Sequence, residues 1–147
     1  MSRAEIYAAL HARAFPVEGA WTAADFADLL SLSTTEVEEI SSAGTLVSIL
    51  VAQVVAGEAE ILTLATAPEA RRQGFAQRLL SQMEQRLRPS GLSKWLLDVA
   101  ADNSGARAFY EALGFQIDGQ RKDYYERLEG SRVDAILMSK PVGGQTP

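Results

Sequence analysis

Apolar residues recur at helical spacing near the start of the chain. Within residues 4–15 they stand three or four positions apart, at Ile6, Leu10 and Ala14, so this stretch is predicted to be an amphipathic helix. In TAADFADLL, residues 22–30, a threonine precedes the apolar stripe and has the side chain of a typical helix N-cap. The pattern therefore predicts two short helices before any strand.

Three β-rich runs follow these helices. They cover residues 36–40, 45–56 and 58–66, and the short turns SSAG and AGE separate them. Turns of this length join neighbouring antiparallel strands. We therefore expect a three-stranded antiparallel meander.

The second half of the chain alternates helical stripes with strand-like runs. Helices are expected at residues 74–87 and 103–114, and strands at residues 94–100, 115–120 and 132–140. A strand reached through a helical crossover is normally parallel to the strand before it. The run KWLLDVA at 94–100 is nearly all apolar, which is typical of a strand buried on both faces. The predicted order ααβββαβαββ gives an α/β fold with one mixed sheet between helices.

Length and composition narrow the class of protein. A chain of 147 residues with 47% hydrophobic and 22% charged residues is expected to form one globular domain, over residues 1–141, followed by a flexible tail at 142–147. No run reaches the roughly 18 apolar residues of a membrane span, and the start has no secretory pattern, so we expect a cytoplasmic protein without a membrane partner. With no cysteine and one histidine, no metal site is expected.

Charge is distributed unevenly along the chain. Residues 1–60 carry two arginines and nine carboxylates, whereas residues 61–147 carry twelve basic and ten acidic side chains. An acidic half favours a cationic ligand such as an amine or a basic peptide, and a basic cluster favours an anion. An acidic chain of net charge −5 is a poor nucleic-acid binder, so no such partner is expected.

The junction TAPEARRQGFAQRLL, residues 66–80, gathers positive charge before a helix. Arg71 and Arg72 precede Gly74, where the helix is expected to begin. The first turn of a helix presents unpaired backbone N–H groups, and a glycine lets a phosphate approach them closely. We therefore interpret Gln73, Gly74, Phe75 and Ala76 as a cradle for a pyrophosphate. Neither GxxxxGK[ST] nor GxGxxG is present, so the common nucleotide loops do not apply.

The chain resembles the GNAT superfamily of acyl-CoA N-acyltransferases over roughly residues 4–140, and the motifs within residues 58–115 are specific as a set. The matching motifs are AEILTLATAP, RRQGFAQRLL, KWLLDVAADN and SGARAFYEALGF, and the subgroup most similar to them is the bacterial ribosomal-protein-alanine N-acetyltransferases. The resemblance implies the GNAT fold, with the family's first strand missing before residue 4. It also implies acetyl-CoA as the acyl donor, with cofactor-binding residues at Leu64, Ala65, Thr66, Arg71, Arg72, Gln73, Gly74, Phe75, Ala76, Asn103, Ala106 and Tyr110.

The resemblance also implies catalytic roles. Tyr110 matches the tyrosine that lies beside the thioester sulfur and protonates the departing thiolate, although a packed aromatic is an equally simple explanation of its helical position. Asp98 stands where the subgroup has a glutamate that serves as the base. Its apolar neighbours suggest a buried carboxylate, which could instead be a structural acid. Glu60 is the second candidate base, or a site for the substrate's ammonium.

The acceptor is predicted to be a protein N-terminus, as in a ribosomal protein, because an α-amine has a pKa about 2.5 units below that of lysine and is easier to deprotonate. In RKDYYE the tyrosines Tyr124 and Tyr125 resemble those that line the subgroup's peptide side, and Trp21 would line the opposite wall. Ordinary anchoring of loops by aromatic side chains is the alternative for all three, and the preferred one for Trp21. Direct transfer in a ternary complex is expected, since no cysteine is present. A small amine or lysine acceptor, a non-catalytic acyl-CoA-binding module, and a monomer or homodimer stay open.

Overall fold

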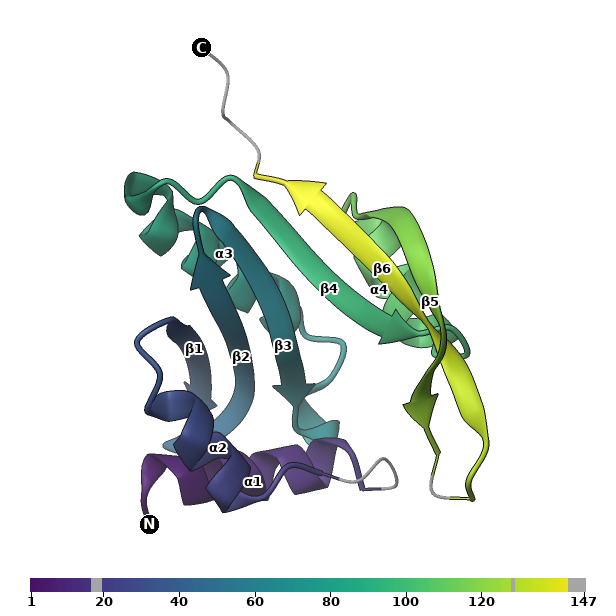
Figure 1. Ribbon diagram of the computed structural model, residues 1–147. Coiled ribbons are helices and arrows are strands. Elements are labelled where there is room, and N and C mark those ends of the chain that lie inside the picture. The colour runs from purple at the N-terminus through teal and green to yellow at the C-terminus, as the bar shows by residue number, and fades with distance from the viewer. Residues whose placement is uncertain (17–19, 128, 143–147) are drawn as a thin grey trace.

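The computed structural model describes residues 1–16, 20–127 and 129–142. Four α-helices and six strands follow one another in the predicted order ααβββαβαββ (Figure 1). They are α1 (Arg3–Ala14), α2 (Ala23–Leu30), β1 (Thr35–Ser42), β2 (Thr45–Val55), β3 (Glu58–Thr66), α3 (Phe75–Leu87), β4 (Lys94–Ala100), α4 (Ser104–Ala112), β5 (Gln116–Glu126) and β6 (Arg132–Pro141), with single 3₁₀ turns at Pro68–Ala70 and Arg88–Ser90.

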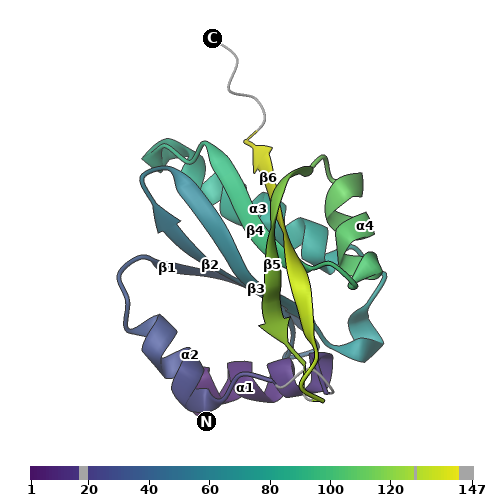
Figure 2. The same ribbon diagram turned by 45° about the vertical axis from the view of Figure 1, so that its right-hand side comes forward.

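All six strands form one mixed sheet in the order β1-β2-β3-β4-β6-β5. The expected antiparallel meander of β1, β2 and β3 is confirmed, and β4 is parallel to β3 as its helical crossover predicted. Helices α1 and α2 lie on one face of the sheet, and α3 and α4 lie on the other (Figures 1 and 2). None of the helices among the described residues is long and apolar enough to cross a membrane.

Strands β3 and β4 are paired only at one end. Their register holds for three residue pairs, from Glu58 opposite Lys94 to Glu60 opposite Leu96. Beyond these pairs the two strands separate, and Figure 1 shows them diverging toward their carboxyl ends. The sheet is therefore split in its middle, with β1, β2 and β3 on one side and β4, β6 and β5 on the other.

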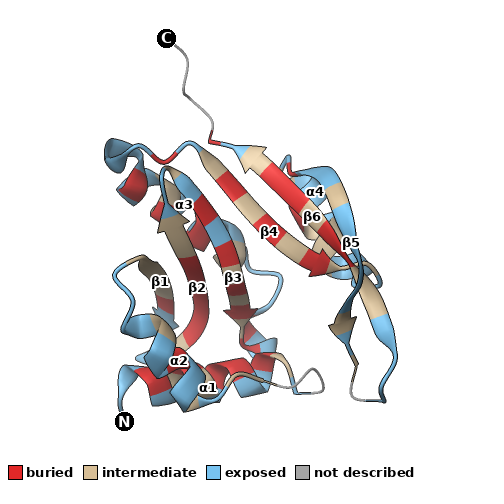
Figure 3. Cartoon of the chain, in the orientation of Figure 1, coloured by how far each residue is buried: buried red, intermediate tan, exposed pale blue. Residues whose placement is uncertain are grey.

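Burial corrects one prediction about the strands. Strand β4 alternates between buried and half-buried residues, so only one of its faces is enclosed (Figure 3). The strand buried on both faces is β2, where residues 47–52 are all buried between the α1 and α3 layers. The solid apolar run of β4 was misleading, because its second face carries apolar residues that no helix covers completely.

Both N-terminal helices begin with reciprocal side-chain caps. The Ser2 hydroxyl accepts a hydrogen bond from the Glu5 amide at 3.1 Å, and the Glu5 carboxylate accepts one from the Ser2 amide at 2.8 Å. Thr22, the predicted cap, makes the same pair of bonds with Asp25. Caps of this kind contribute about 1 kcal/mol each to stability, which lets helices as short as α2 form.

Two segments near the C-terminus differ from the predicted boundaries. Strand β5 continues to Glu126, well beyond the predicted end at residue 120, because an irregular segment at residues 121–125 keeps it paired with β6. Val142, which the sequence placed in the tail, is buried, and its amide donates a hydrogen bond to the Ser93 carbonyl at 2.9 Å. The other tail residues, 143–147, lie outside the described part of the chain.

Candidate active site

The first turn of α3 offers unpaired backbone amides. Gly74 is the N-cap of this helix and lies in the left-handed region, at φ 79°. The first hydrogen bond within the helix runs from the Arg78 amide to the Gly74 carbonyl at 3.0 Å. In the described part of the chain no side chain caps the helix, and the amides of residues 73–76 have no hydrogen-bond acceptor. These are the amides that the sequence assigned to a pyrophosphate cradle.

The turn before α3 has a backbone shape that exposes these amides. Arg72 has φ 63°, which is unusual for a residue with a side chain, and it is followed two positions later by Gly74. Apart from Gly74 and its immediate neighbours in the chain, no atom lies within 4 Å of the place where a Cβ on Gly74 would be. A ligand can therefore approach the backbone here without meeting a side chain.

The arginines of the junction are not equivalent. The guanidinium of Arg71 donates a hydrogen bond to the Ala14 carbonyl at 2.8 Å, so it ties the C-terminus of α1 to the cradle. Arg72 is exposed. Arg78, one turn into α3, has its guanidinium carbon 5.6 Å from the centre of the Phe75 ring. Arg72 and Arg78 are therefore the cations with side chains best placed to meet an anion at this helix end.

The N-terminus of α4 lies at the same edge of the sheet. Because β3 and β4 are parallel and each leads into its helix, α3 and α4 both begin beyond the carboxyl ends of these strands. The Asn103 side-chain oxygen accepts a hydrogen bond from the Ala106 amide at 3.1 Å. Ligands of open α/β sheets bind beyond the carboxyl ends of parallel strands, and here that edge is where β3 and β4 separate.

Strand β3 has one free edge beside the cradle. Residues 64–66 pair with residues 48–50 of β2 on one side. On the other side the pairing with β4 ends at Glu60. Backbone N–H and C=O groups of this part of β3 are therefore available to an extended, amide-containing molecule, which could add to the edge as a strand does.

Tyr110 lies in an aromatic cluster on α4. Its ring centre is 5.1 Å from that of Phe109 and 5.2 Å from that of Phe115, and the residue is only 8% exposed. Burial raises the pKa of the Tyr110 phenol above its usual value. The phenol therefore keeps its proton at any pH at which the protein would work, as a proton donor must. The packed position and the donor role are compatible.

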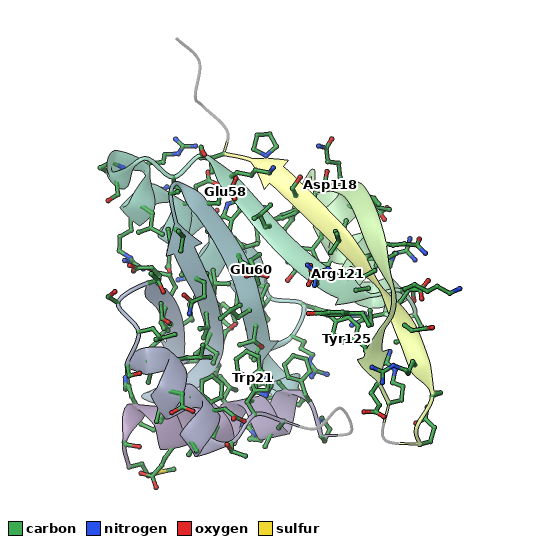
Figure 4. The ribbon with its side chains drawn as sticks, in the orientation of Figure 1. Trp21, Glu58, Glu60, Asp118, Arg121 and Tyr125 are labelled. Carbon is green, nitrogen blue, oxygen red and sulfur yellow. The ribbon has the colours of Figure 1, made fainter. Side chains whose placement is uncertain are left out.

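Asp98 and Tyr125 share the face of the sheet opposite α3 and α4. Asp98 is half-buried on β4, opposite Leu137 of β6, so the prediction of a fully buried carboxylate is wrong. Burial, and next the negative charge of Asp98, raise the pKa of Tyr125 to about 12. Figure 4 shows the side chain of Tyr125 extending from strand β5 toward the middle of the sheet. The structure thus places one candidate base and one predicted substrate residue on the same face of the sheet.

Glu60 lies on the same face as Asp98. It is exposed and sits opposite Leu96, two residues before Asp98 on β4. Because side chains of a strand alternate between its faces, Leu96 and Asp98 share the face that Glu60 occupies. Glu58, also exposed, belongs to the same row of β3. This face carries a strip of three carboxylates, at Glu58, Glu60 and Asp98.

The remaining predicted substrate residues are Tyr124 and Trp21. Tyr124 is 45% exposed, and its ring lies 5.1 Å from that of Tyr125. Trp21 is half-buried in the connection between α1 and α2, and Figure 4 places it across the sheet face from Tyr125. The two tyrosines and the tryptophan therefore come from separate elements on either side of the place where β3 and β4 part.

A family model described as the Acetyltransferase (GNAT) family matches residues 5–115, more than half of the chain. The chain belongs to the GNAT family of acetyltransferases. It is an enzyme of the predicted class, and the alternative of a non-catalytic module is set aside by this membership.

Two relatives of this GNAT acetyltransferase carry the name [Ribosomal protein bS18]-alanine N-acetyltransferase. The protein from Escherichia coli K12 is 35% identical over 104 residues, which cover 71% of this chain and 70% of that protein. The one from Haemophilus ducreyi is 32% identical over 113 residues, or 77% and 74%. The crystal structure of the Escherichia coli ribosomal-protein-S18-alanine N-acetyltransferase superposes with a TM-score of 0.83 at 29% identity, covering 100% of this chain and 96% of that one.

Sequence reasoning missed the structural role of His11 in this GNAT enzyme. His11 is 4% exposed, its Nδ1 accepts a hydrogen bond from the Trp21 amide at 3.1 Å, and its Nε2 lies 3.0 Å from the Thr63 hydroxyl. Its ring also stacks on Trp21 at 5.0 Å. His11 therefore fixes the wall residue Trp21 to α1 and β3. Its place on the apolar stripe of α1 was a signal that it is buried.

The burial of His11 predicts a dependence of stability on pH. Burial lowers its pKa to about 4 from the ordinary 6.5, so the unfolded chain binds a proton that the folded chain does not between these values. The resulting stability is complete above pH 6.5, and on the order of 3 kcal/mol is lost as the pH falls to about 4. Urea unfolding of the wild type and of His11→Asn between pH 4 and 7.5 would measure the free energy of unfolding at each pH. This free energy should change less steeply with pH in the variant than in the wild type. Equal slopes would contradict this explanation.

Proposed function

We propose that this enzyme transfers the acetyl group of acetyl-CoA to the α-amine at the N-terminus of a protein. The name of its relatives, alanine N-acetyltransferase of ribosomal protein bS18, supports a protein acceptor. The observation that carries the proposal is the split sheet. The uncapped start of α3 and Tyr110 lie toward the α3 and α4 side of the split, and the strip of Glu58, Glu60 and Asp98 lies on the other face. Two reactants can therefore meet where β3 and β4 separate.

The residues at the split fit coenzyme A. The uncapped amides at residues 73–76 and the cations of Arg72 and Arg78 suit its pyrophosphate. The free edge of β3 at Leu64, Ala65 and Thr66 suits the amides of its pantetheine arm. The bound cofactor supplies the acetyl group as a thioester. Arg71 stays a prediction for this site, since its guanidinium bonds to Ala14.

The chain's own residues would then move two protons. The amine must lose a proton before its nitrogen forms a bond to the acetyl carbon, and the sulfur gains one as the carbon–sulfur bond breaks. We assign the first proton to Asp98, as the acceptor. Because an aspartate is one methylene shorter than the glutamate it replaces, the proton would pass to it directly or through one water. We assign the second to Tyr110, whose buried phenol is protonated at working pH.

An α-amine is the acceptor best matched to this site. Its ordinary pKa of about 7.7 to 8.0 lies about 2.5 units below that of lysine, which corresponds to about 3.4 kcal/mol less work of deprotonation. An amine that is easier to deprotonate demands less of the group that accepts its proton. The 45% exposure of Tyr124 favours an open peptide groove over an enclosed pocket for a small amine.

Mass spectrometry of peptide acetylation tests the proposal. Peptides beginning with Ala, Ser or Thr and containing an internal lysine should each gain one acetyl group, at the N-terminus, when acetyl-CoA is present. The same peptides with a blocked N-terminus should gain none. Acetylation of the lysine alone, or of polyamines or aminosugars in preference to every peptide, would overturn the proposed acceptor while leaving the family assignment intact.

The role of Asp98 has its own expected result. Asp98→Asn keeps the shape of the side chain and removes the basic oxygen, so kcat for peptide acetylation should fall about 100-fold near pH 7, a magnitude typical of general-base catalysis. The loss should shrink as the pH rises and more of the amine is neutral. A variant with unchanged kcat across this range would assign the proton to another group, of which Glu60 is the nearest candidate on that face.

A further inference from the structure

Strand β5 contains an irregular segment next to Tyr125. Arg121 lies opposite Ala135 of β6, and the next recorded pair is Tyr125 opposite Val133. Three residues of β5, numbers 122–124, are thus opposed by the single residue Asp134. Within this bulge Asp123 has φ 51°, a conformation that is unfavourable for a residue with a side chain.

The side chain of Asp134 bonds to the bulge at two points. One carboxylate oxygen accepts a hydrogen bond from the Asp123 amide at 2.9 Å, and the other accepts one from the Gln120 side-chain amide at 2.9 Å. The backbone carbonyl of Asp134 also accepts a hydrogen bond from the Ala101 amide, just after β4, at 2.8 Å. Asp134 therefore links the bulge of β5 to the end of the strand that carries Asp98.

The bulge sets the position of Tyr125 along the sheet face that carries Asp98. With regular pairing from Arg121 onward, Tyr125 would lie opposite Ser131. The two extra residues place it opposite Val133 instead, which is closer by two residues, about 7 Å, to the level of Asp98. A shift of two residues leaves a side chain on the same face of the sheet, so the bulge changes how far Tyr125 reaches and not the side it faces.

We propose that Asp134 is a positioning residue for the acceptor amine, because its carboxylate holds the β5 bulge that moves Tyr125 two residues closer to the level of Asp98, on the same face of the sheet. The inference rests on the proposed function for its meaning in catalysis. Its structural part does not, since the register of β5 can be measured without any substrate. Asp134 would act through Tyr125 and does not itself touch the reactants.

The register is tested first, by NMR on the free protein. In the wild type, Tyr125 should show cross-strand contacts to Val133, and the Asp123 amide should be protected from exchange. In Asp134→Ala the Asp123 amide should lose its protection, and contacts from Tyr125 to Ser131 should gain intensity. Asp134→Asn, which keeps one acceptor oxygen, should be intermediate. An unchanged register and unchanged protection in Asp134→Ala would overturn the inference, whether or not the protein acetylates peptides.

Kinetics then tests the consequence, with the amine that the wild type acetylates. Asp134→Ala should raise KM for that acceptor about tenfold and leave KM for acetyl-CoA unchanged. In the background of Tyr125→Phe, Asp134→Ala should cause no further loss, because the two residues act as one unit. Asp118→Asn is the matched control, since it removes a carboxylate at the other register shift of β5, between Ile117 and Gly119, and should behave as wild type. Additive losses, or equal changes in both KM values, would contradict the positioning role.

Discussion

Tyr110→Phe is expected to lower kcat about 100-fold or more, within the range of 10²- to 10⁴-fold for general acid catalysis, and to leave KM for acetyl-CoA and for the peptide within about twofold. The substitution keeps the ring that packs between Phe109 and Phe115 and removes only the phenol oxygen. The departing thiolate would then have to take its proton from water. Steady-state rates with both substrates varied would measure the effect.

A second tyrosine provides the control for this experiment. Tyr7 is as buried as Tyr110, but its hydroxyl donates a hydrogen bond to Glu39, at the outer strand of the sheet. Tyr7→Phe should therefore lower the free energy of unfolding by about 1 kcal/mol and leave kcat unchanged. If Tyr110→Phe also lowered only the stability and kept the full kcat, Tyr110 would be a packed aromatic without a role in catalysis.

Gly74→Ala is expected to raise KM for acetyl-CoA at least tenfold while leaving KM for the peptide unchanged. Alanine is unfavourable at φ 79°, so the turn would rotate and the amides at the start of α3 would no longer point at one place. Loss of even one hydrogen bond to a charged phosphate costs about 1.5 to 3 kcal/mol, and each 1.4 kcal/mol is tenfold in affinity. Calorimetry with coenzyme A would measure the change directly.

Gly44→Ala separates the cradle from ordinary backbone strain. Gly44 has φ 81° in the turn between β1 and β2, and no atom lies within 4 Å of its absent Cβ, as for Gly74. Both alanine variants should lose a similar stability, about 1 kcal/mol. Only Gly74→Ala should weaken coenzyme A binding. If the two variants bound the cofactor equally well, the start of α3 would not be the phosphate site.

The order and pairing of the elements followed from local signals. Short turns between β-rich runs specified the meander, and the crossover through residues 74–87 specified the parallel pairing of β3 and β4. The burial of β4 did not follow, because an apolar run does not show whether a helix covers both faces. That depends on α1 and α2, which lie closer to β2 than to β4 (Figure 1).

Parts of the candidate site were visible in the sequence for similar reasons. Two arginines and a glycine before a helical stripe marked the cradle, since these residues act through the local backbone. The backbone angle of Arg72, the bond from Arg71 to Ala14 and the half-exposure of Asp98 depend on how distant elements pack. The same holds for His11 and Asp134, whose partners lie far away in the chain or across a strand pair.

The separation of β3 from β4 after only three residue pairs has a consequence for turnover. If the cofactor enters from the side of α3 and α4 and the peptide from the opposite face, the sheet itself divides the two routes. Neither product then blocks the exit of the other, and a fresh cofactor can load while an acetylated chain end is still departing.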